Sequence, residues 1–216
     1  MPKILAAGLF VASLINPSAS VPGVPSGGTT AVPPKIPVTV TMVTANGTGC
    51  PGGTTAVVPY PDGTGLHVIY TDYGVRDGAG VPLTEARKNC QVSLQVRAPS
   101  GFTYAVSRAS YRGHADLVPG TVGTLRSEYR FAGMPQTDIH RHTFTEPFEG
   151  PWSVVEVPSA DSLQFAPCGE NRILNLNTEL RVRNGSAAGG QVSFLVMDSA
   201  TTGSSSDYEF EWKTCP

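Results

Sequence analysis

Apolar residues recur at every second position along much of this chain, and this period constrains its fold more than any other feature. In residues 91–98, for example, Val92, Leu94 and Val96 alternate with polar residues. Successive side chains of a strand point to opposite faces of a sheet, so this alternation predicts strands with one buried and one solvated face. Similar runs lie at residues 38–43, 66–71, 174–183, 192–196 and 208–213.

The alternation also predicts which side chains are buried. We expect the core to include Val92, Leu94, Val96, Leu174, Leu176, Leu180, Phe210 and Trp212. We expect the other face of these strands to stay largely exposed, with Gln91, Ser93, Gln95, Glu209 and Glu211. In residues 192–196 the apolar row consists of Val192, Phe194 and Val196, which predicts that these three side chains share the buried face.

Turn-forming residues separate these runs, since the chain has 24 Gly and 19 Pro among its 216 residues. That density disfavours helices, and only residues 82–89 could hold one, of about one or two turns. Pro-Ser-Gly at residues 99–101 predicts a hairpin between its flanking strands. A parity shift within residues 102–112 predicts a β-bulge near Ser107 and Arg108. The predicted fold is all-β: a single antiparallel β-sandwich, jelly-roll-like, over residues 38–216.

Residues 1–20 have the pattern of a secretory signal peptide, with Lys3, an apolar run over residues 4–15, and Ser18, Ala19 and Ser20 before the cleavage point. We expect the mature chain to begin at Val21. The apolar run is shorter than the roughly 20 residues that cross a bilayer, so a membrane anchor is not expected. Residues 21–37, rich in Pro and Gly, predict a disordered leader. The expected location is secreted, either extracellular or in a cell wall.

The four cysteines are an even number in a chain that is expected to follow an oxidising route, which predicts two disulfides. Three pairings are possible. We favour Cys50–Cys90 and Cys168–Cys215, because sequence neighbours are usually spatial neighbours and each pair lies at strand ends. Loop entropy cannot choose among the pairings, since it depends only on the logarithm of loop length.

Five blocks of sequence stand out: GCPGG at residues 49–53, VPLTEARKNCQ at 81–91, YRG at 111–113, SLQFAPCG at 162–169 and WKTC at 212–215. In this order they resemble a secreted family catalogued as domain of unknown function 4360 (DUF4360). The resemblance covers residues 44–215. It implies a small exported β-rich protein with four cysteines, and it implies no catalytic or binding residue.

The charge of the chain argues against two classes of partner. Fifteen Lys and Arg against 17 Asp and Glu give a net charge of −2, and no basic block stands out along the sequence. Nucleic acid and anionic membranes are therefore not expected as partners. No cofactor is expected either.

Two segments contain side chains that can ligate metal ions. His140 and His142 would share one face of a strand with Asp138. Asp72 and Asp77 lie in a Gly-rich loop, where carboxylates can bind calcium. The simpler interpretations are an exposed polar strand and an ordinary loop. Because neither segment has a complete ligand pattern, no metal site is predicted.

The sequence carries no motif that indicates catalysis: no G-x-S-x-G, no H-E-x-x-H and no phosphate-binding loop. A glycosidase needs two carboxylates facing a cleft, and the sequence cannot pair its candidates Glu128, Glu146, Glu149, Glu156, Asp161, Glu170 and Glu179. The histidines His67, His114, His140 and His142 accompany no nucleophile motif. A structural role beside Cys90 is expected for Glu85, Arg87 and Lys88. The sequence allows two interpretations of the aromatic residues Tyr60, Tyr73, Tyr111 and Trp152: an exposed platform on which sugars stack, or ordinary core packing.

Asn46 and Asn184 begin N-x-[ST] sequons at predicted turns and are candidate glycosylation sites. Taken together, the residues predict a secreted, non-catalytic β-sandwich that recognises polysaccharide or an extracellular protein. The alternatives are an extracellular polysaccharide hydrolase or lyase and a structural wall or coat protein. An enzyme would show convergent ionisable groups in a cleft, whereas a sugar binder would show exposed aromatic side chains on a shallow surface.

Overall fold

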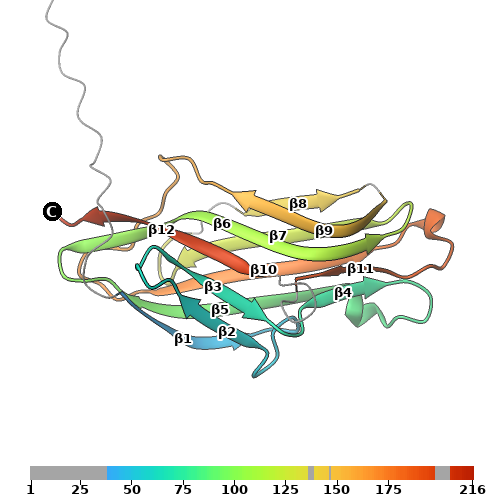
Figure 1. Ribbon diagram of the computed structural model, residues 1–216, viewed down its shortest axis with the longest axis horizontal. Helices are drawn as coiled ribbons and strands as arrows, with labels where there is room; N and C mark the ends of the chain where they lie inside the picture. Colours follow the sequence, from blue (N-terminus) through green and yellow to red (C-terminus); the bar gives the residue numbers. More distant parts are fainter. Residues whose placement is uncertain (1–37, 136–138, 146, 198–204) are drawn as a thin grey trace, which may run out of the picture.

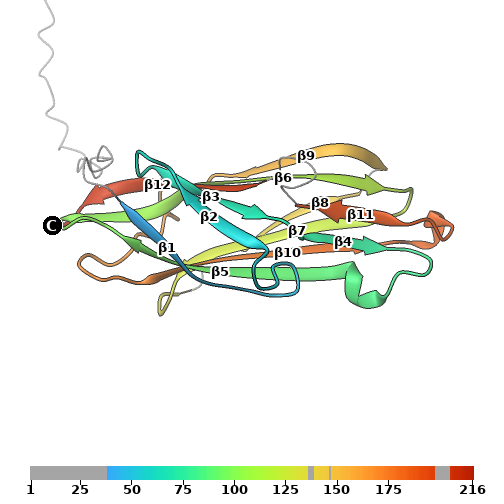
Figure 2. The same cartoon turned by 60° about the horizontal axis from the view of Figure 1, so that its bottom comes forward.

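The computed structural model describes residues 38–135, 139–145, 147–197 and 205–216. Two antiparallel sheets pack face to face in it (Figure 1). Figure 2 shows the two layers, with β6 and β9 along the top and β5 along the bottom. The predicted β-sandwich is therefore confirmed. The signal peptide and the leader that we predicted at residues 1–37 lie outside the described residues.

The first sheet has five strands in the order β1 (Thr39–Asn46), β5 (Arg87–Arg97), β10 (Ile173–Arg183), β7 (Val122–Phe131) and β8 (His140–Phe144). The second sheet has seven. Six of them follow the order β2 (Thr55–Pro59), β3 (Gly65–Tyr70), β12 (Ser206–Thr214), β6 (Phe102–Leu117), β11 (Ser193–Val196) and β4 (Gly74–Asp77). The seventh, β9 (Phe148–Glu156), pairs with β6 outside this order.

The 16-residue strand β6 organises the seven-stranded sheet. Its first part pairs with β12, and its last part pairs with both β11 and β9. Opposite Glu209 and Phe210 of β12 the register skips Ser107, which confirms the bulge predicted there. Gly113 of β6 is closely approached by residues of the two neighbouring strands β9 and β11. A Cβ at this position would overlap the Trp152 ring and the Val196 carbonyl oxygen. Only glycine fits such an approach.

The inward faces of the two sheets form one hydrophobic core. The eight side chains predicted from the alternation to be buried are all buried. Fully burying a large apolar side chain stabilises a fold by roughly 1.5–3 kcal/mol. Ser93 departs from its prediction: it is 8% exposed, and its hydroxyl donates to Asn175 Oδ1 at 2.8 Å. A small hydroxyl that bonds across the sheet can lie beneath its longer neighbours.

Two further expectations are wrong. Residues 99–101 do not form a hairpin, because β5 and β6 belong to different sheets and this connection crosses between the layers. In β11 the buried row is Ser193 and Leu195, whereas Phe194 and Val196 lie on the other face and remain partly exposed. Ser193 is tolerated inside because its hydroxyl accepts from Val118 N at 3.1 Å and contacts the Thr121 hydroxyl at 2.9 Å.

Helical structure is confined to short turns among the described residues. The 3-10 turn η1 (Leu83–Ala86) lies in the one segment that was predicted to allow a helix. A second turn, η2 (Ser186–Ala188), was not predicted. It ends at Gly189, whose φ of 59° is left-handed and therefore suits glycine.

Both disulfides have the predicted pairing. Cys50–Cys90 joins the loop after β1 to the central part of the five-stranded sheet, with Cα atoms 5.3 Å apart. Cys168–Cys215 fixes the end of the chain just after β12, with Cα atoms 5.8 Å apart. The bridged residues are 40 and 47 positions apart in sequence. In the chain-entropy account, each loop of this size stabilises the fold by roughly 4 kcal/mol.

Five tyrosines in the core give the fold a testable sensitivity to alkali. Burial raises the pKa of Tyr70 to about 12 and raises the pKa values of Tyr73, Tyr104, Tyr111 and Tyr208 further. In the unfolded chain tyrosine has a pKa of about 10. The stability that protonated tyrosines contribute is therefore complete below pH 10 and is lost as the pH rises through 12.

We expect absorbance at 295 nm to report these five tyrosinates only when circular dichroism reports loss of the sheets. Ionisation of all tyrosines near pH 10 with an unchanged dichroism spectrum would contradict the buried placement.

Candidate functional site

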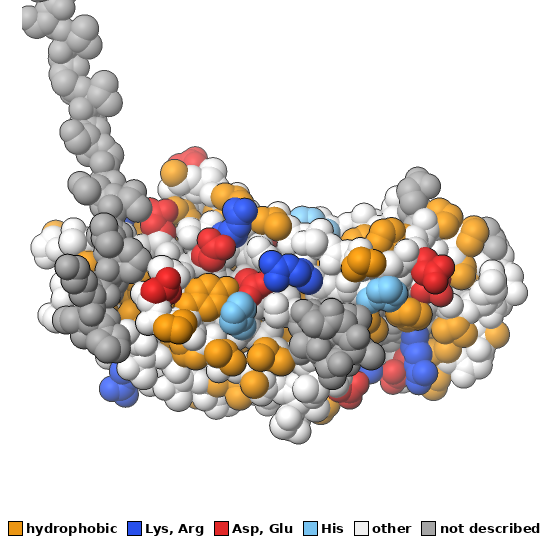
Figure 3. Space-filling model, viewed as in Figure 1, with side chains coloured by type: hydrophobic (Ala, Val, Ile, Leu, Met, Phe, Trp, Pro, Cys, Tyr) orange, Lys and Arg blue, Asp and Glu red, His pale blue; other side chains and the backbone are white. Residues whose placement is uncertain are grey.

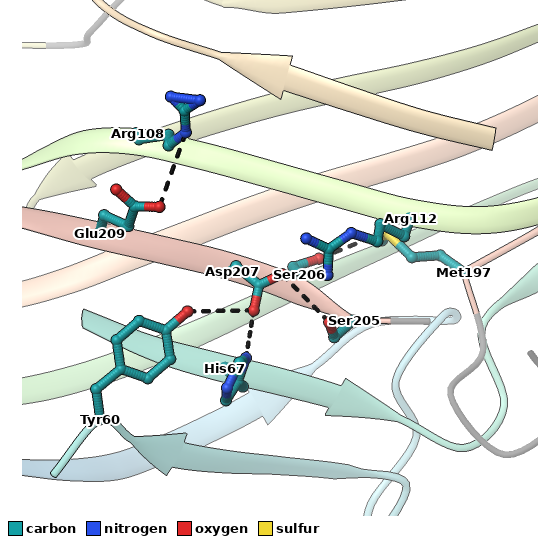
Figure 4. Close-up of polar contacts among 9 residues, drawn as sticks. All are labelled: Tyr60, His67, Arg108, Arg112, Met197, Ser205, Ser206, Asp207 and Glu209. Atoms are coloured by element: carbon teal, nitrogen blue, oxygen red, sulfur yellow. Dashed lines mark hydrogen bonds and ion pairs between the residues drawn. The ribbon is translucent and has the colours of Figure 1, made fainter. Parts of the chain in front are cut away.

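Four side chains donate hydrogen bonds to the carboxylate of Asp207 on the outer face of the seven-stranded sheet (Figure 4). The Tyr60 hydroxyl and His67 Nδ1 donate to Oδ1, the former at 3.2 Å. Arg112 and the Ser205 hydroxyl donate to Oδ2, at 3.1 Å and 3.3 Å. One carboxylate thus fixes an imidazole, a phenol and a guanidinium on one surface.

Strand register brings these residues together. Asp207 lies between the buried Ser206 and Tyr208, so the period of two directs its side chain outward. It is directly opposite His67 of β3, and Arg112 follows on the neighbouring strand β6. Sequence reasoning singled out Tyr60 and His67 separately but missed Asp207. The alternation indicates that Asp207 points outward, but it does not reveal a partner 140 residues away.

The four donors satisfy Asp207 while leaving its neighbours accessible. The Asp207 side chain is 9% exposed, whereas those of His67 and Arg112 are 45% and 55% exposed. Burial, the charge of Asp207 and the hydrogen bond to it raise the pKa of Tyr60 to about 12. Tyr60 therefore stays a protonated donor at physiological pH. With Nδ1 held by Asp207, the Nε2 atom of His67 is left for a ligand.

A second pair of rings lies on the same outer face. His114 is two residues beyond Arg112 on β6 and stacks on Phe194 of β11, with ring centroids 6.1 Å apart and an angle of 22°. In the first pair, Tyr60 and His67 meet edge to face at 4.6 Å. Figure 3 shows this face, where charged and histidine side chains lie among exposed hydrophobic ones. We call these five residues, Tyr60, His67, Arg112, His114 and Phe194, the ring face.

The aromatic platform suggested by the sequence does not form as a group. Tyr73, Tyr111 and Trp152 are buried in the core, so these three cannot stack on a sugar. Only Tyr60 of the four lies on the outer face. On the outer face, Phe194 is the aromatic residue of β11. The sequence analysis did not predict this, because the alternation with Val192 and Val196 suggested that Phe194 faces the core.

The residues considered as metal ligands do not assemble. His140 stacks on Tyr129 at 5.9 Å, and the Asp77 carboxylate accepts from Asn184 N at 2.8 Å. Asp72 is exposed, and Asp138 lies outside the described residues. Within the described ranges, no group of three or more His, Cys, Asp or Glu side chains is arranged to hold a metal ion.

His142 instead meets Glu156, one of the carboxylates considered for catalysis. His142 Nε2 donates to Glu156 at 3.0 Å, Tyr111 donates at 3.4 Å, and the buried Ser127 hydroxyl also donates. The Glu156 side chain is only 1% exposed. Because Glu156 ends β9 and Ser127 and His142 belong to β7 and β8, these hydrogen bonds connect the two sheets.

The other candidate carboxylates have structural partners or lie in solvent. Glu128 lies between Arg126 and Arg130, at 3.6 Å and 3.4 Å, and Glu179 accepts from Arg87 at 2.6 Å. The remaining described candidates, Glu149, Asp161 and Glu170, are exposed. Glu146 lies outside the described residues.

The block before Cys90 carries ion pairs, in keeping with the structural role expected for it. Glu85 pairs with Lys88 at 3.2 Å across η1, and Arg87 pairs with Glu179 of the neighbouring strand. These contacts hold the start of β5 against β10.

The two sequons differ in accessibility. Asn46 is exposed at the end of β1. The side-chain amide of Asn184 donates to Asp77 O and Gln191 O at 3.1 Å and 2.7 Å. A glycan on Asn184 Nδ2 would remove one of the two hydrogens that these bonds use. Glycosylation at either residue stays a prediction, and Asn46 is the more accessible acceptor.

Comparison with known proteins gives a family and one relative. The family model described as "Domain of unknown function (DUF4360)" matches residues 37–215. A protein of Arthroderma benhamiae described as "Uncharacterized secreted protein" is 32% identical over 203 residues, covering 93% of this chain and 80% of the relative. No helix in the described parts of the chain has the length and apolar character needed to cross a membrane.

Two solved structures show weaker similarity. One is TmCBM61 in complex with β-1,4-galactotriose, at 11% identity and a TM-score of 0.25, covering 83% of this chain and 89% of that one. The other is the enzymatically active domain of tailspike protein 4 of bacteriophage CBA120, at 9% identity and a TM-score of 0.24, covering 83% and 19%. TM-scores this low do not transfer a ligand or an activity to this chain.

Replacing Glu156 tests its role between the sheets. We expect Glu156→Ala to lower the free energy of unfolding by about 3 kcal/mol, because Ser127 and Tyr111 would be buried without an acceptor. Glu149→Ala, on the exposed face of the same strand, should change it by less than about 0.5 kcal/mol. Urea denaturation measures both, and equal effects of the two substitutions would show that the buried bonds contribute nothing.

Proposed function

This chain belongs to the DUF4360 family and is a secreted protein, and on that basis we propose that it recognises extracellular polysaccharide without cleaving it. The ring face is the proposed binding surface. The observation that carries the proposal is the pair of ring clusters, Tyr60–His67 and His114–Phe194, on one outer sheet face, with Arg112 on β6, the strand that also carries His114.

The chemistry of this surface suits a sugar chain. Pyranose rings present apolar C–H faces that pack on aromatic rings, together with hydroxyls that exchange hydrogen bonds. Arg112 supplies donors, and His67 Nε2 accepts when Nδ1 carries the proton. From strand spacing, His67 and His114 are about 17 Å apart, so a bound chain of several sugar units could contact both ring pairs. A surface of this length favours a polymer over a monosaccharide.

Asp207 favours binding over catalysis at this surface. General acid–base chemistry needs groups that can exchange protons with the substrate. Asp207 already accepts four hydrogen bonds, and the pKa of Tyr60, raised to about 12, keeps its proton in place near neutral pH. Of the groups that contact Asp207, only His67 remains to transfer a proton. Asp207 is thus a positioning residue, which holds His67 and Arg112 in one orientation.

The test is affinity electrophoresis of the purified protein in gels that contain soluble galactan, mannan, xylan or β-1,3-glucan. We expect at least one of these neutral polysaccharides to retard migration. Arg112→Gln and His67→Ala should each weaken that retardation by about tenfold, since each removes a hydrogen-bonding group from the surface. Arg97→Gln is the matched control, because Arg97 is an exposed arginine on the opposite sheet.

The substitution Asp207→Asn tests whether Asp207 positions His67 and Arg112 for binding. It should weaken binding as well, because the amide accepts from Arg112 and His67 less strongly than a carboxylate does. Normal migration in all four gels, or equal weakening by Arg97→Gln, would overturn the proposal. Release of reducing ends or of unsaturated products from any of the polysaccharides, lost in His67→Ala, would establish the hydrolase or lyase alternative instead.

A further inference from the structure

Five arginines gather on the outer face of the five-stranded sheet, opposite the ring face. They are Arg87 of β5, Arg126 of β7, Arg141 of β8, and Arg181 and Arg183 of β10. No basic block is visible in the sequence because these residues come from four strands. Sheet register alone assembles them, in a chain whose net charge is −2. We call them the arginine cluster.

Like charges face one another directly in this cluster. Arg126 is the cross-strand partner of Arg141, and Arg181 is the cross-strand partner of Arg87. Like charges directly opposite each other in a sheet are destabilising. A ligand with negative charge would relieve this repulsion.

The carboxylates nearby leave most of the cluster without a counter-charge. Glu179 is occupied by Arg87 at 2.6 Å, and Glu128 is shared by Arg126 and Arg130. Among the described residues, Arg141, Arg181 and Arg183 have no hydrogen-bond or ion-pair partner, and all three are exposed. Three guanidinium groups are thus available to an external anion.

The surface is hollowed where these side chains meet. Four of the arginines line a hollow of about 230 Å³ with Glu179: Arg126, Arg141, Arg181 and Arg183. Arg181 and Arg183 also line an adjoining hollow of about 570 Å³, which Arg87 borders together with the carboxylates of Asp77 and Glu179. From β8 to β5 the cluster spans three strand spacings, or about 14 Å. A single carboxylate or sulfate group is much smaller than this extent. The cluster therefore suits a chain that carries several anionic groups.

We propose that the arginine cluster binds an acidic polysaccharide through its carboxylate or sulfate groups. All the cations are arginines, whose planar forks bind oxyanions in bidentate fashion, whereas lysine acts as a point charge. The site is independent of the proposed function, because it lies on the other sheet and requires charged rather than neutral chains. A protein with both sites would contact glycans on two opposite faces.

The test measures binding of the whole protein to immobilised heparin and to polygalacturonate at low salt, with neutral dextran as the uncharged probe. We expect both acidic glycans to bind, dextran not to bind at this site, and affinity to fall as salt is added. Arg181→Gln and Arg141→Gln should each weaken binding by about tenfold. Heparin alone would assign the anionic group as sulfate, and polygalacturonate binding would assign carboxylate; either result supports the site.

Two controls keep the proposal falsifiable. Arg97→Gln removes an exposed arginine from the same sheet outside the cluster, and it should leave affinity unchanged. Arg141→Gln should not lower the melting temperature, since it removes a repulsion with Arg126. Failure of both acidic glycans to bind, or equal losses from Arg97→Gln and Arg181→Gln, would overturn the proposal. Double-stranded DNA binding as tightly as the glycans would also overturn it, since the surface would then select only charge.

Discussion

Burial of apolar side chains between the two sheets is the interaction on which the rest of the structure depends. The inward rows of β3, β5, β6, β10 and β12 form one core. Because strand side chains alternate, fixing one row inward fixes the next row outward. The burial of Ser206 and Tyr208 therefore turns Asp207 outward, and the burial of Leu180 and Val182 turns Arg181 and Arg183 outward. Both proposed binding surfaces result from this alternation.

The core also contains polar groups that apolar burial alone would exclude. Glu156 lies inside with three donors, and the Tyr73 hydroxyl donates to Thr178 at 3.2 Å. Burying such groups costs free energy unless they are hydrogen-bonded. The bonds from Ser127 and His142 to Glu156 connect strands of different sheets, so they favour one relative placement of the layers, which packing alone specifies less sharply.

Much of the fold could be predicted from the sequence, because period-two runs such as 91–98 and 208–213 report one buried face directly. Prediction failed where local pattern is ambiguous. The Pro-Ser-Gly sequence of residues 99–101 suits a turn within one sheet as well as a connection between two sheets. Only the long-range pairing of the flanking strands decides which of the two forms. In β11 both parities carry apolar or small residues, so the choice of Leu195 over Phe194 for the core depended on neighbouring strands. The cysteine pairing was predictable because the bridged residues are close in sequence.

The sites were less predictable than the fold. His67 and Asp207 are 140 residues apart, and the arginine cluster draws on four strands, so no local motif marks either one. The sequence could name Tyr60 and His67 as candidates but could not join them. The sequence analysis also considered Tyr73, Tyr111 and Trp152 as possible surface aromatics, whereas all three are buried in the core.

The most direct test of the central claim is a map of amide chemical-shift changes when the ¹⁵N-labelled protein is titrated with neutral galactan, mannan, xylan and β-1,3-glucan. Recognition through the ring face predicts changes concentrated at His67, Arg112, His114 and Phe194, on β3, β6 and β11 of one sheet. The five-stranded sheet should be unaffected by these neutral chains. An absence of changes with all four polysaccharides, or changes confined to the opposite sheet, would contradict the account.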